Sequence, residues 1–200
     1  MPLVVGFDLD LTLIDSRAGI AATYRELSAR TGVTIDADLV VTRLGPPLAH
    51  EMANWFPPAD VASAVATYRS LYPTFAVTPT TPMPGAVAAI AAVHEAGGRV
   101  VVVTAKNGPH ARLHLDHLGL AVDELAGDLW AAEKGVRLRG LGASVYVGDH
   151  VADMTAARVA GATAVGVTSG PCDADELTAG GADVVLPDLH AFPDWLRRRG

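Results

Sequence analysis

The chain has 200 residues, of which 50% are hydrophobic and 18% are charged. This length suits a single domain or a core domain with a small insert, and the composition excludes a disordered chain. The net charge of −7 disfavours nucleic acid and anionic membranes as partners. An anionic ligand would therefore need a local attraction, which a bound cation supplies.

The cysteine content and the apolar runs bear on where the protein works. Cys172 is the sole cysteine, so no disulfide can form within the chain, and we interpret it as an ordinary loop residue. The chain opens without a basic stretch followed by a long apolar segment, which argues against a signal peptide. Its apolar runs fall short of the ~18 residues needed to span a bilayer. We expect a cytoplasmic protein.

Short valine-rich runs alternate with helical stretches along most of the chain. The runs predict buried strands at residues 3–7, 99–104, 143–149, 163–168 and 182–186. Helices are expected between Pro84 and Gly98, at residues 151–160 and at residues 175–179. This alternation predicts an α/β fold, a three-layer Rossmann-like core whose parallel sheet carries helices on both faces. In such sheets the ligand binds beyond the carboxyl ends of the strands.

Residues 16–81 interrupt this rhythm, because they contain no valine-rich strand. Helices are expected at residues 18–31 and 58–72. A stiff returning link is expected from four prolines, Pro73, Pro79, Pro82 and Pro84. We therefore expect a catalytic core formed by residues 1–15 and 82–200, with residues 16–81 inserted as a small helical domain.

Polar side chains follow the predicted strands at the edge where a ligand would bind. They are Asp8 and Asp10 after the first strand, Thr104 at the end of the second, Lys134 before the third, and Asp149 and Asp153 after the third. Two carboxylates as close as Asp8 and Asp10 repel each other unless a cation or a proton lies between them. Mg²⁺ binds carboxylate and carbonyl oxygens, and a carboxylate can also attack phosphorus. The pair alone fits a simple turn equally well; with the other residues it predicts a Mg²⁺ site.

Thr104 and Lys134 are candidates for holding an anion. The turn after Thr104 opens a helix, whose free N–H groups favour a phosphoryl group, and Lys134 can neutralise both phosphate and Asp8. The chain has thirteen arginines but only two lysines, Lys106 and Lys134. A codon bias toward arginine would explain this usage, and under such a bias the positions that remain lysine gain interest.

These residues resemble the motifs of the haloacid dehalogenase superfamily. The segment Asp8-Leu-Asp-Leu-Thr12 resembles its first motif, DxDxT, and Gly148-Asp-His-Val-Ala-Asp153 resembles its fourth, GDxxxD. Thr104 and Lys134 match the second and third motifs in order and placement. The resemblance is strongest to phosphoglycolate phosphatase-like members, and the insert is similar to their helical cap. One departure is Leu11, where many members have glycine, which affects the turn but no side-chain function.

The resemblance implies a role for each residue of the first motif. Asp8 would be the nucleophile and a metal ligand. Asp10 would be the general acid and base and would bind Mg²⁺ through its backbone carbonyl. Asp149 would be a further metal ligand. Asp153 would act on the metal through a water molecule, or it would support the residues that bind the metal directly.

The resemblance also implies the substrate contacts and the substrate class. Thr104 and Lys134 would hold the phosphoryl group, with Ala105 as a neighbouring contact. Arg43 lies in the cap loop that touches substrate in similar proteins, and a plain surface arginine is equally consistent. The expected partner is a small phosphorylated metabolite, hydrolysed by a monomer or a homodimer.

Other functions remain as alternatives. A phosphomutase of the β-phosphoglucomutase-like group shares every core motif and is the second hypothesis. A dehalogenase is disfavoured because members with that activity lack the aspartate that Asp10 supplies, and a phosphonatase because residues 16–81 contain no lysine. Receiver domains are shorter and order these residues differently, and a binding protein would not need every motif position filled.

Three histidines, His110, His114 and His117, fall on one side of a predicted helix. Their spacing could hold a transition metal. A solvated helix face is the more common outcome of such a pattern, and we expect that here.

Overall fold

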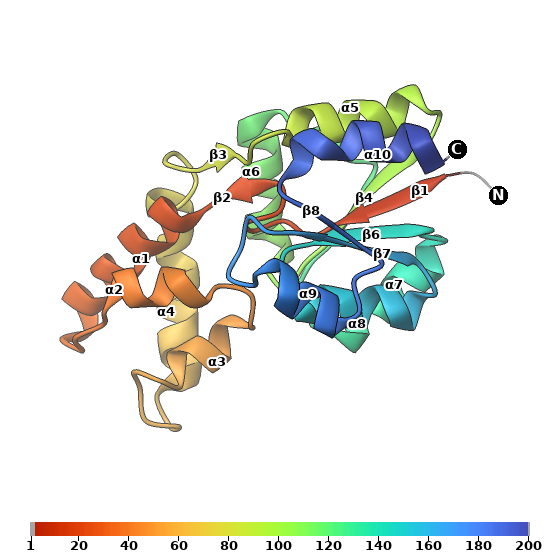
Figure 1. The fold of residues 1–200 in the computed structure, drawn as a ribbon. Helices are drawn as coiled ribbons and strands as arrows, with labels where there is room; N and C mark the ends of the chain where they lie inside the picture. Colours follow the sequence, from red (N-terminus) through yellow and green to blue (C-terminus); the bar gives the residue numbers. More distant parts are fainter. Residues whose placement is uncertain (1–2, 200) are drawn as a thin grey trace.

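The computed structural model describes residues 3–199 and contains a six-stranded parallel sheet (Figure 1). The strands lie in the order β5-β4-β1-β6-β7-β8. Their bounds are β1 Val4–Phe7, β4 Arg99–Val103, β5 Glu124–Ala126, β6 Val145–Gly148, β7 Thr163–Val167 and β8 Val184–Leu186. The predicted α/β fold with a Rossmann-like parallel sheet is confirmed.

The central strands are buried on both faces, which explains why they read as continuous valine runs. Val101, Val102 and Val103 of β4 are all fully buried, although alternate residues point to opposite faces. Val5 of β1 pairs with Val100 of β4 on one side and with Val145 of β6 on the other. The first strand therefore lies in the middle of the sheet, and the chain extends the sheet away from it in both directions.

Helices cover both faces of the sheet (Figure 1). One face packs against α5 Ala86–Glu95, α6 Gly108–Leu118 and α10 Phe192–Arg199. The other face packs against α7 Ala132–Leu141, α8 Val151–Ala160 and α9 Ala174–Gly180. Each face has its own apolar cluster, so the core has the three layers that the alternation predicted.

The sequence expectation omitted three strands. β5 was missed because its residues are only half-buried and it lies at the sheet edge, where an apolar run is not required. Two further strands, β2 Ile14–Asp15 and β3 Thr81–Pro82, pair in an antiparallel ribbon. They are two residues long and carry no periodic pattern, and they form the two crossings between the core and the inserted helices.

The inserted helices form a separate apolar cluster beside the carboxyl ends of the sheet strands (Figure 1). They are α1 Arg17–Thr31, α2 Ala37–Val40, α3 Leu48–Met52 and α4 Val61–Phe75. Tyr24 of α1 packs on Tyr68 of α4, with ring centroids 4.7 Å apart. We call this unit the cap. Pro73 was expected in a stiff link, but it lies inside α4, which continues past it to Phe75.

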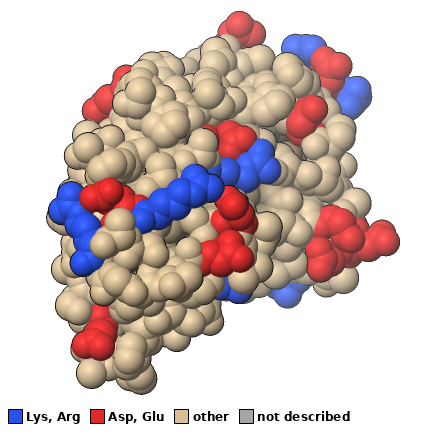
Figure 2. Space-filling model, turned by 90° about the vertical axis from the view of Figure 1, so that its left-hand side faces the viewer, with Lys and Arg blue, Asp and Glu red and all other residues tan. Residues whose placement is uncertain are grey.

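Two features of the described residues concern the membrane and the surface charge. Among residues 3–199, no helix is long and apolar enough to cross a membrane. On the cap side of the molecule, basic and acidic side chains are interspersed, with acidic groups beside the row of basic ones (Figure 2). A mixed face of this kind does not attract a polyanion as a one-signed surface would.

Candidate active site

The sheet order brings the predicted residues to one place. Asp8 follows β1, Thr104 follows β4 and Asp149 follows β6. Because β1 lies between β4 and β6, these three residues sit at neighbouring strand ends. All three are buried, with 6%, 1% and 2% of their surface exposed.

The loop after β1 folds tightly on itself. The Leu9 carbonyl accepts hydrogen bonds from the N–H groups of Leu13 and Ile14, at 2.9 and 3.0 Å. Leu11 takes a left-handed conformation with φ of 59°, which costs a residue with a Cβ about 1 kcal/mol. The Ser169 hydroxyl donates to the Leu11 carbonyl at 2.7 Å, and the Leu11 side chain is buried. The loop therefore keeps the turn that a glycine would favour, and packing and this hydrogen bond support it.

Three carboxylates converge at the base of the site. Asp8, Asp149 and Asp153 each offer an oxygen, and these oxygens lie within 4.8 Å of one another. The Thr12 hydroxyl donates to Oδ1 of Asp149 at 2.7 Å. Oδ1 of Asp8 is buried and has no hydrogen-bond partner among the described residues. A buried carboxylate oxygen without a hydrogen bond is costly, and its free lone pairs are suited to a metal ligand.

Lys134 is the one basic group of the described chain that pairs with these carboxylates. Its Nζ donates to Oδ1 of Asp153 at 2.7 Å and lies 3.1 Å from Oδ1 of Asp8, as an ion pair without hydrogen-bond geometry. The Tyr146 hydroxyl is 3.3 Å from the same Asp153 oxygen. One ammonium group faces three carboxylates, so the site keeps a surplus of negative charge.

Burial and this surplus of negative charge raise the pKa of two of the carboxyl groups. Burial raises the pKa of Asp8 to about 6, against the lowering effect of Lys134. Burial, and then the charges of Asp153 and Asp8, raise the pKa of Asp149 well above its usual range. Buried carboxylates that lie this close to one another favour a proton or a divalent cation between them. The donor set, all oxygen, fits Mg²⁺.

The fourth motif needs its glycine for steric reasons. A Cβ on Gly148 would lie 2.4 Å from the side-chain atoms of Asp153. Asp153 uses its second oxygen to accept from the His150 N–H at 3.2 Å, and His150 Nδ1 accepts from the Ala152 N–H at 3.0 Å. His150, which sequence reasoning left without a role, therefore caps α8 and helps to orient Asp153.

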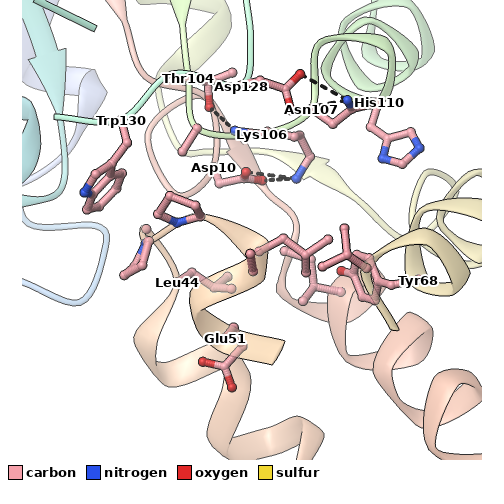
Figure 3. A pocket seen from close by; sticks show the side chains of 18 of the residues that line it. Asp10, Leu44, Glu51, Tyr68, Thr104, Lys106, Asn107, His110, Asp128 and Trp130 are labelled. Carbon is pink, nitrogen blue, oxygen red and sulfur yellow. Dashed lines mark hydrogen bonds and ion pairs between the residues drawn. The ribbon is translucent and has the colours of Figure 1, made fainter. Parts of the chain in front are cut away.

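Asp10 lies apart from this acidic cluster, with its side chain turned toward the cap (Figure 3). Its carboxylate accepts from the Ser16 hydroxyl at 2.5 Å and from Lys106 Nζ at 2.8 and 2.9 Å. Burial alone would raise the pKa of Asp10, but Lys106 outweighs it and the pKa falls below its usual value. The expected metal contact of Asp10 is therefore left to its backbone carbonyl.

Lys106 is the functional residue that the sequence reasoning did not assign. It is 7% exposed and forms a two-oxygen ion pair with Asp10. The signal was present, since Lys106 and Lys134 are the only lysines in the chain. Each of the two pairs with one of the aspartates of the first motif.

A cavity of about 250 Å³ lies between the cap and the core above Asp8 and Asp10. Thr104 and Ala105, two of the residues predicted to contact substrate, line it from the core side, whereas Lys134 does not line it. Arg43 lines it from the cap, but its guanidinium makes hydrogen bonds of 2.9 and 2.8 Å to Glu51. Arg43 therefore reaches the cavity already paired, and not as a free cation.

The three histidines of α6 have separate environments, contrary to the expected solvated face. His114 is fully buried and hydrogen bonded to Tyr72 of the cap, while His117 is exposed. His110 stacks on the Tyr72 ring. The group within residues 3–199 that is arranged to hold a metal ion is the set of three aspartates.

The match to known families agrees with this geometry. A family model of haloacid dehalogenase-like hydrolases matches residues 5–158, which include every motif residue described above. The chain belongs to this family. The expected resemblance is confirmed, and so is the expectation that the chain is a hydrolase of this family.

Curated relatives of this haloacid dehalogenase-like hydrolase include two kinds of enzyme. A phosphoglycolate phosphatase of Rhodospirillum rubrum is 30% identical over 221 residues, which cover 98% of this chain and 91% of that protein. The tyrosine-protein kinase PtkA of Mycobacterium tuberculosis is 31% identical over 120 residues, covering 60% of this chain and 41% of the kinase. The chain thus spans less than half the length of that kinase.

Solved structures of the family share the whole fold. A haloacid dehalogenase-like hydrolase from Streptococcus pneumoniae superimposes with a TM-score of 0.85 at 22% identity, covering 98% of both chains. A predicted phosphoglycolate phosphatase from Haemophilus somnus gives 0.81 at 21% identity and covers 100% of this chain and 98% of that one. At this identity the agreement establishes the fold alone.

Proposed function

We propose that this chain is a Mg²⁺-dependent phosphatase that hydrolyses a small phosphomonoester through an aspartyl-phosphate on Asp8. The observation that carries the proposal is the buried Oδ1 of Asp8, which accepts no hydrogen bond from the described residues and lies 3.1 Å from the ammonium group of Lys134. A carboxylate oxygen that accepts no hydrogen bond beneath a cavity is available both as a nucleophile and as a metal ligand. The membership of the family supports the same chemistry.

The residues of the site divide the first step between them. An oxygen of Asp8 forms a bond to phosphorus while the bond from phosphorus to the ester oxygen breaks. Asp10 gives its proton to that leaving oxygen. Thr104, which lines the cavity, and Lys134, which is buried beside Asp8, are proposed to hold the phosphoryl oxygens, and the positive charge of Lys134 offsets the charge that develops there.

The second step returns the enzyme to its starting state. Asp10 takes a proton from water, whose oxygen bonds to phosphorus as the bond to Asp8 breaks, and inorganic phosphate leaves. Lys106 and Ser16 hold Asp10 as a carboxylate in the structure, which is the form that acts as this base. In the first step Asp10 must carry a proton on one oxygen, while its other oxygen can keep the hydrogen bond from Lys106.

Asp8 and Asp149, with the Asp10 carbonyl, are proposed to hold Mg²⁺, and Asp153 supports them from behind. When bound, Mg²⁺ neutralises the surplus charge of the carboxylates and of the phosphoryl group. Without a cation the cluster repels phosphate, because one lysine faces three carboxylates.

The size of the cavity and the full-length relative bear on the substrate. A cavity of about 250 Å³ is at or below the lower end of ligand pockets, which fits a small metabolite. Phosphoglycolate is the first compound to test, because the phosphoglycolate phosphatase of R. rubrum covers nearly the whole chain. A phosphomutase would use the same residues but would return the phosphoryl group to a sugar instead of releasing it.

The insert at residues 16–81 is proposed to be a lid that closes over the site. The chain enters and leaves it through two short strands, and it covers the cavity above Asp10. Closure would exclude bulk water while the aspartyl-phosphate exists.

The decisive experiment separates Asp8 from Asp10. Asp8→Asn should abolish phosphate release, since an amide is a poor nucleophile. Asp10→Asn keeps the nucleophile and the backbone carbonyl, so with an activated aryl phosphate it should accumulate phosphate on Asp8. Mass spectrometry should then show one added phosphoryl group in Asp10→Asn and none in Asp8→Asn. Parent-like turnover in both variants would refute the proposal.

A further inference from the structure

The cap rests on the core through two histidines of α6. The Tyr72 hydroxyl of α4 lies 3.0 Å from Nε2 of His114, and this contact is buried. The Tyr72 ring stacks on His110, with centroids 4.5 Å apart and planes 13° from parallel. His110 and His114 are four residues apart, so they occupy neighbouring places on one helix face. Together they form a seat for one residue of the cap.

A neighbouring side chain of α4 also links the cap to the core. The Arg69 side chain pairs with Asp128 of the core at 2.9 Å, and Asp128 in turn accepts from the Asn107 amide (Figure 3). One turn of α4 is thus tied to the core at several points.

Tyr72 also contacts the residue that holds Asp10. Nζ of Lys106 lies 4.9 Å from the centre of the Tyr72 ring, within the range of a cation–π contact. The same Nζ makes hydrogen bonds to both oxygens of Asp10. A continuous set of contacts therefore runs from His114 through Tyr72 and Lys106 to Asp10, and it crosses from core to cap and back.

We propose that Tyr72 is a positioning residue: seated on His110 and His114, it holds Lys106 where Lys106 orients Asp10 for proton transfer. This inference rests on the proposed function. It gives the two histidines a role in docking the cap, and it makes correct placement of Asp10 depend on a docked cap. Tyr72 does not need to touch the substrate to act in this way.

The test compares two esters that differ in their need for a proton. Phenyl phosphate has a poor leaving group that needs protonation by Asp10, whereas p-nitrophenyl phosphate needs little. The variants are Tyr72→Phe, Tyr72→Leu, Lys106→Met and the Tyr72→Leu/Lys106→Met double variant. His117→Gln is the matched control, because His117 lies on the same helix but is exposed. Hydrogen exchange of residues 61–75 and 108–118 reports docking without reference to activity.

Tyr72→Leu should lower kcat/KM for phenyl phosphate roughly tenfold more than for p-nitrophenyl phosphate. Tyr72→Phe keeps the ring and loses one hydrogen bond. Its loss of kcat/KM should therefore be only roughly two- to fivefold larger for phenyl phosphate than for p-nitrophenyl phosphate. In the Lys106→Met background, Tyr72→Leu should add less than about a twofold further loss, because the group it acts through is gone. The rate of amide hydrogen exchange should rise in residues 61–75 and 108–118 for Tyr72→Leu, and it should stay unchanged there for His117→Gln.

Several results would overturn the inference. Equal losses on the two esters would show that Tyr72 has only a structural role, and so would full additivity with Lys106→Met. If Tyr72→Leu fails to fold, Tyr72→Phe alone decides by the same comparison of esters. If the parent protein and Asp8→Asn release phosphate equally, the proposed function fails and takes this inference with it. If the parent protein is active but Tyr72→Leu loses the same activity toward both esters, the proposed function stands and only the inference about Tyr72 fails.

Discussion

Replacing Lys134 by methionine would remove the positive charge inside the acidic cluster while keeping a side chain of similar length. The Lys134 side chain is 1% exposed and lies between Asp8 and Asp153, at 3.1 and 2.7 Å. Both carboxylates are themselves nearly buried, at 9% and 1% exposed. Neither would gain a replacement partner, since water has little access to the site.

The expected loss follows from this burial. Removing one partner of a buried ion pair typically costs about 3–5 kcal/mol, because the remaining charge stays desolvated. In the metal-free Lys134→Met protein we expect a loss of unfolding free energy in that range near neutral pH. The loss should shrink at lower pH. Without Lys134 the pKa of Asp8 rises further, so the folded variant binds protons that the unfolded chain releases, and stability falls as pH rises.

The assay is urea denaturation in EDTA at about pH 5 and about pH 8, compared with Arg137→Met. Arg137 lies on the same helix, is 45% exposed and pairs with Glu124. A surface pair of this kind is worth at most about 1 kcal/mol. Added Mg²⁺ should narrow the stability difference between Lys134→Met and the parent protein, and it should leave the difference between Arg137→Met and the parent unchanged. Similar losses in the two variants at about pH 8 would refute the view that the cluster carries surplus charge.

Three further predictions test the metal site and the cap contact. Because burial raises the pKa of Asp8 to about 6, Mg²⁺ must displace a proton at low pH, so calorimetry should show affinity falling as pH drops through that value. Gly170→Ala should weaken Mg²⁺ binding at least tenfold and destabilise the protein by about 1–3 kcal/mol, since the new Cβ would lie 1.8 Å from Oδ2 of Asp149; unchanged affinity would contradict this. Burial lowers the pKa of His114 from 6.5 to about 4. As the pH is lowered, the unfolded chain therefore takes up a proton on this histidine before the folded protein does, and the free energy of unfolding should fall by up to roughly 3 kcal/mol between pH 6.5 and pH 4. His114→Asn should show a smaller loss over that range, measured by denaturation.

Most strands of the core could be predicted, because a parallel strand that is buried on both faces appears in the sequence as a continuous apolar run. The strand at residues 99–103 is nearly all valine, since both of its faces are covered. The half-buried β5 and the two-residue β2 and β3 left no such trace, because edge and ribbon strands are stabilised by pairing and not by an apolar pattern. The helix α4 continues through Pro73 to Phe75, although a proline has no N–H to donate and usually ends a helix, so the local sequence pattern placed its end too early.

The candidate site divides in the same way. Asp8, Asp149 and Lys134 could be chosen from the sequence, because strand ends in a parallel sheet meet at one edge and each residue type has its own chemistry. Lys106 and Tyr72 could not be assigned, since each acquires its role from a neighbour distant in the chain. The pairing of Arg43 with Glu51 was likewise invisible, because it depends on how the cap loop folds.

The sequence by itself determined the fold class, the family and the identity of the charged groups around Asp8. Local spacing and apolar pattern are sufficient for these, because they follow from periodicity and from motifs of adjacent residues. Only the tertiary structure decided which charges pair. It joined Lys134 to Asp8 and Asp153, and Lys106 to Asp10, across separations of up to 126 residues. Pairing of this kind depends on distances of a few ångströms after packing, and Coulomb energy in a dry site changes steeply over such distances.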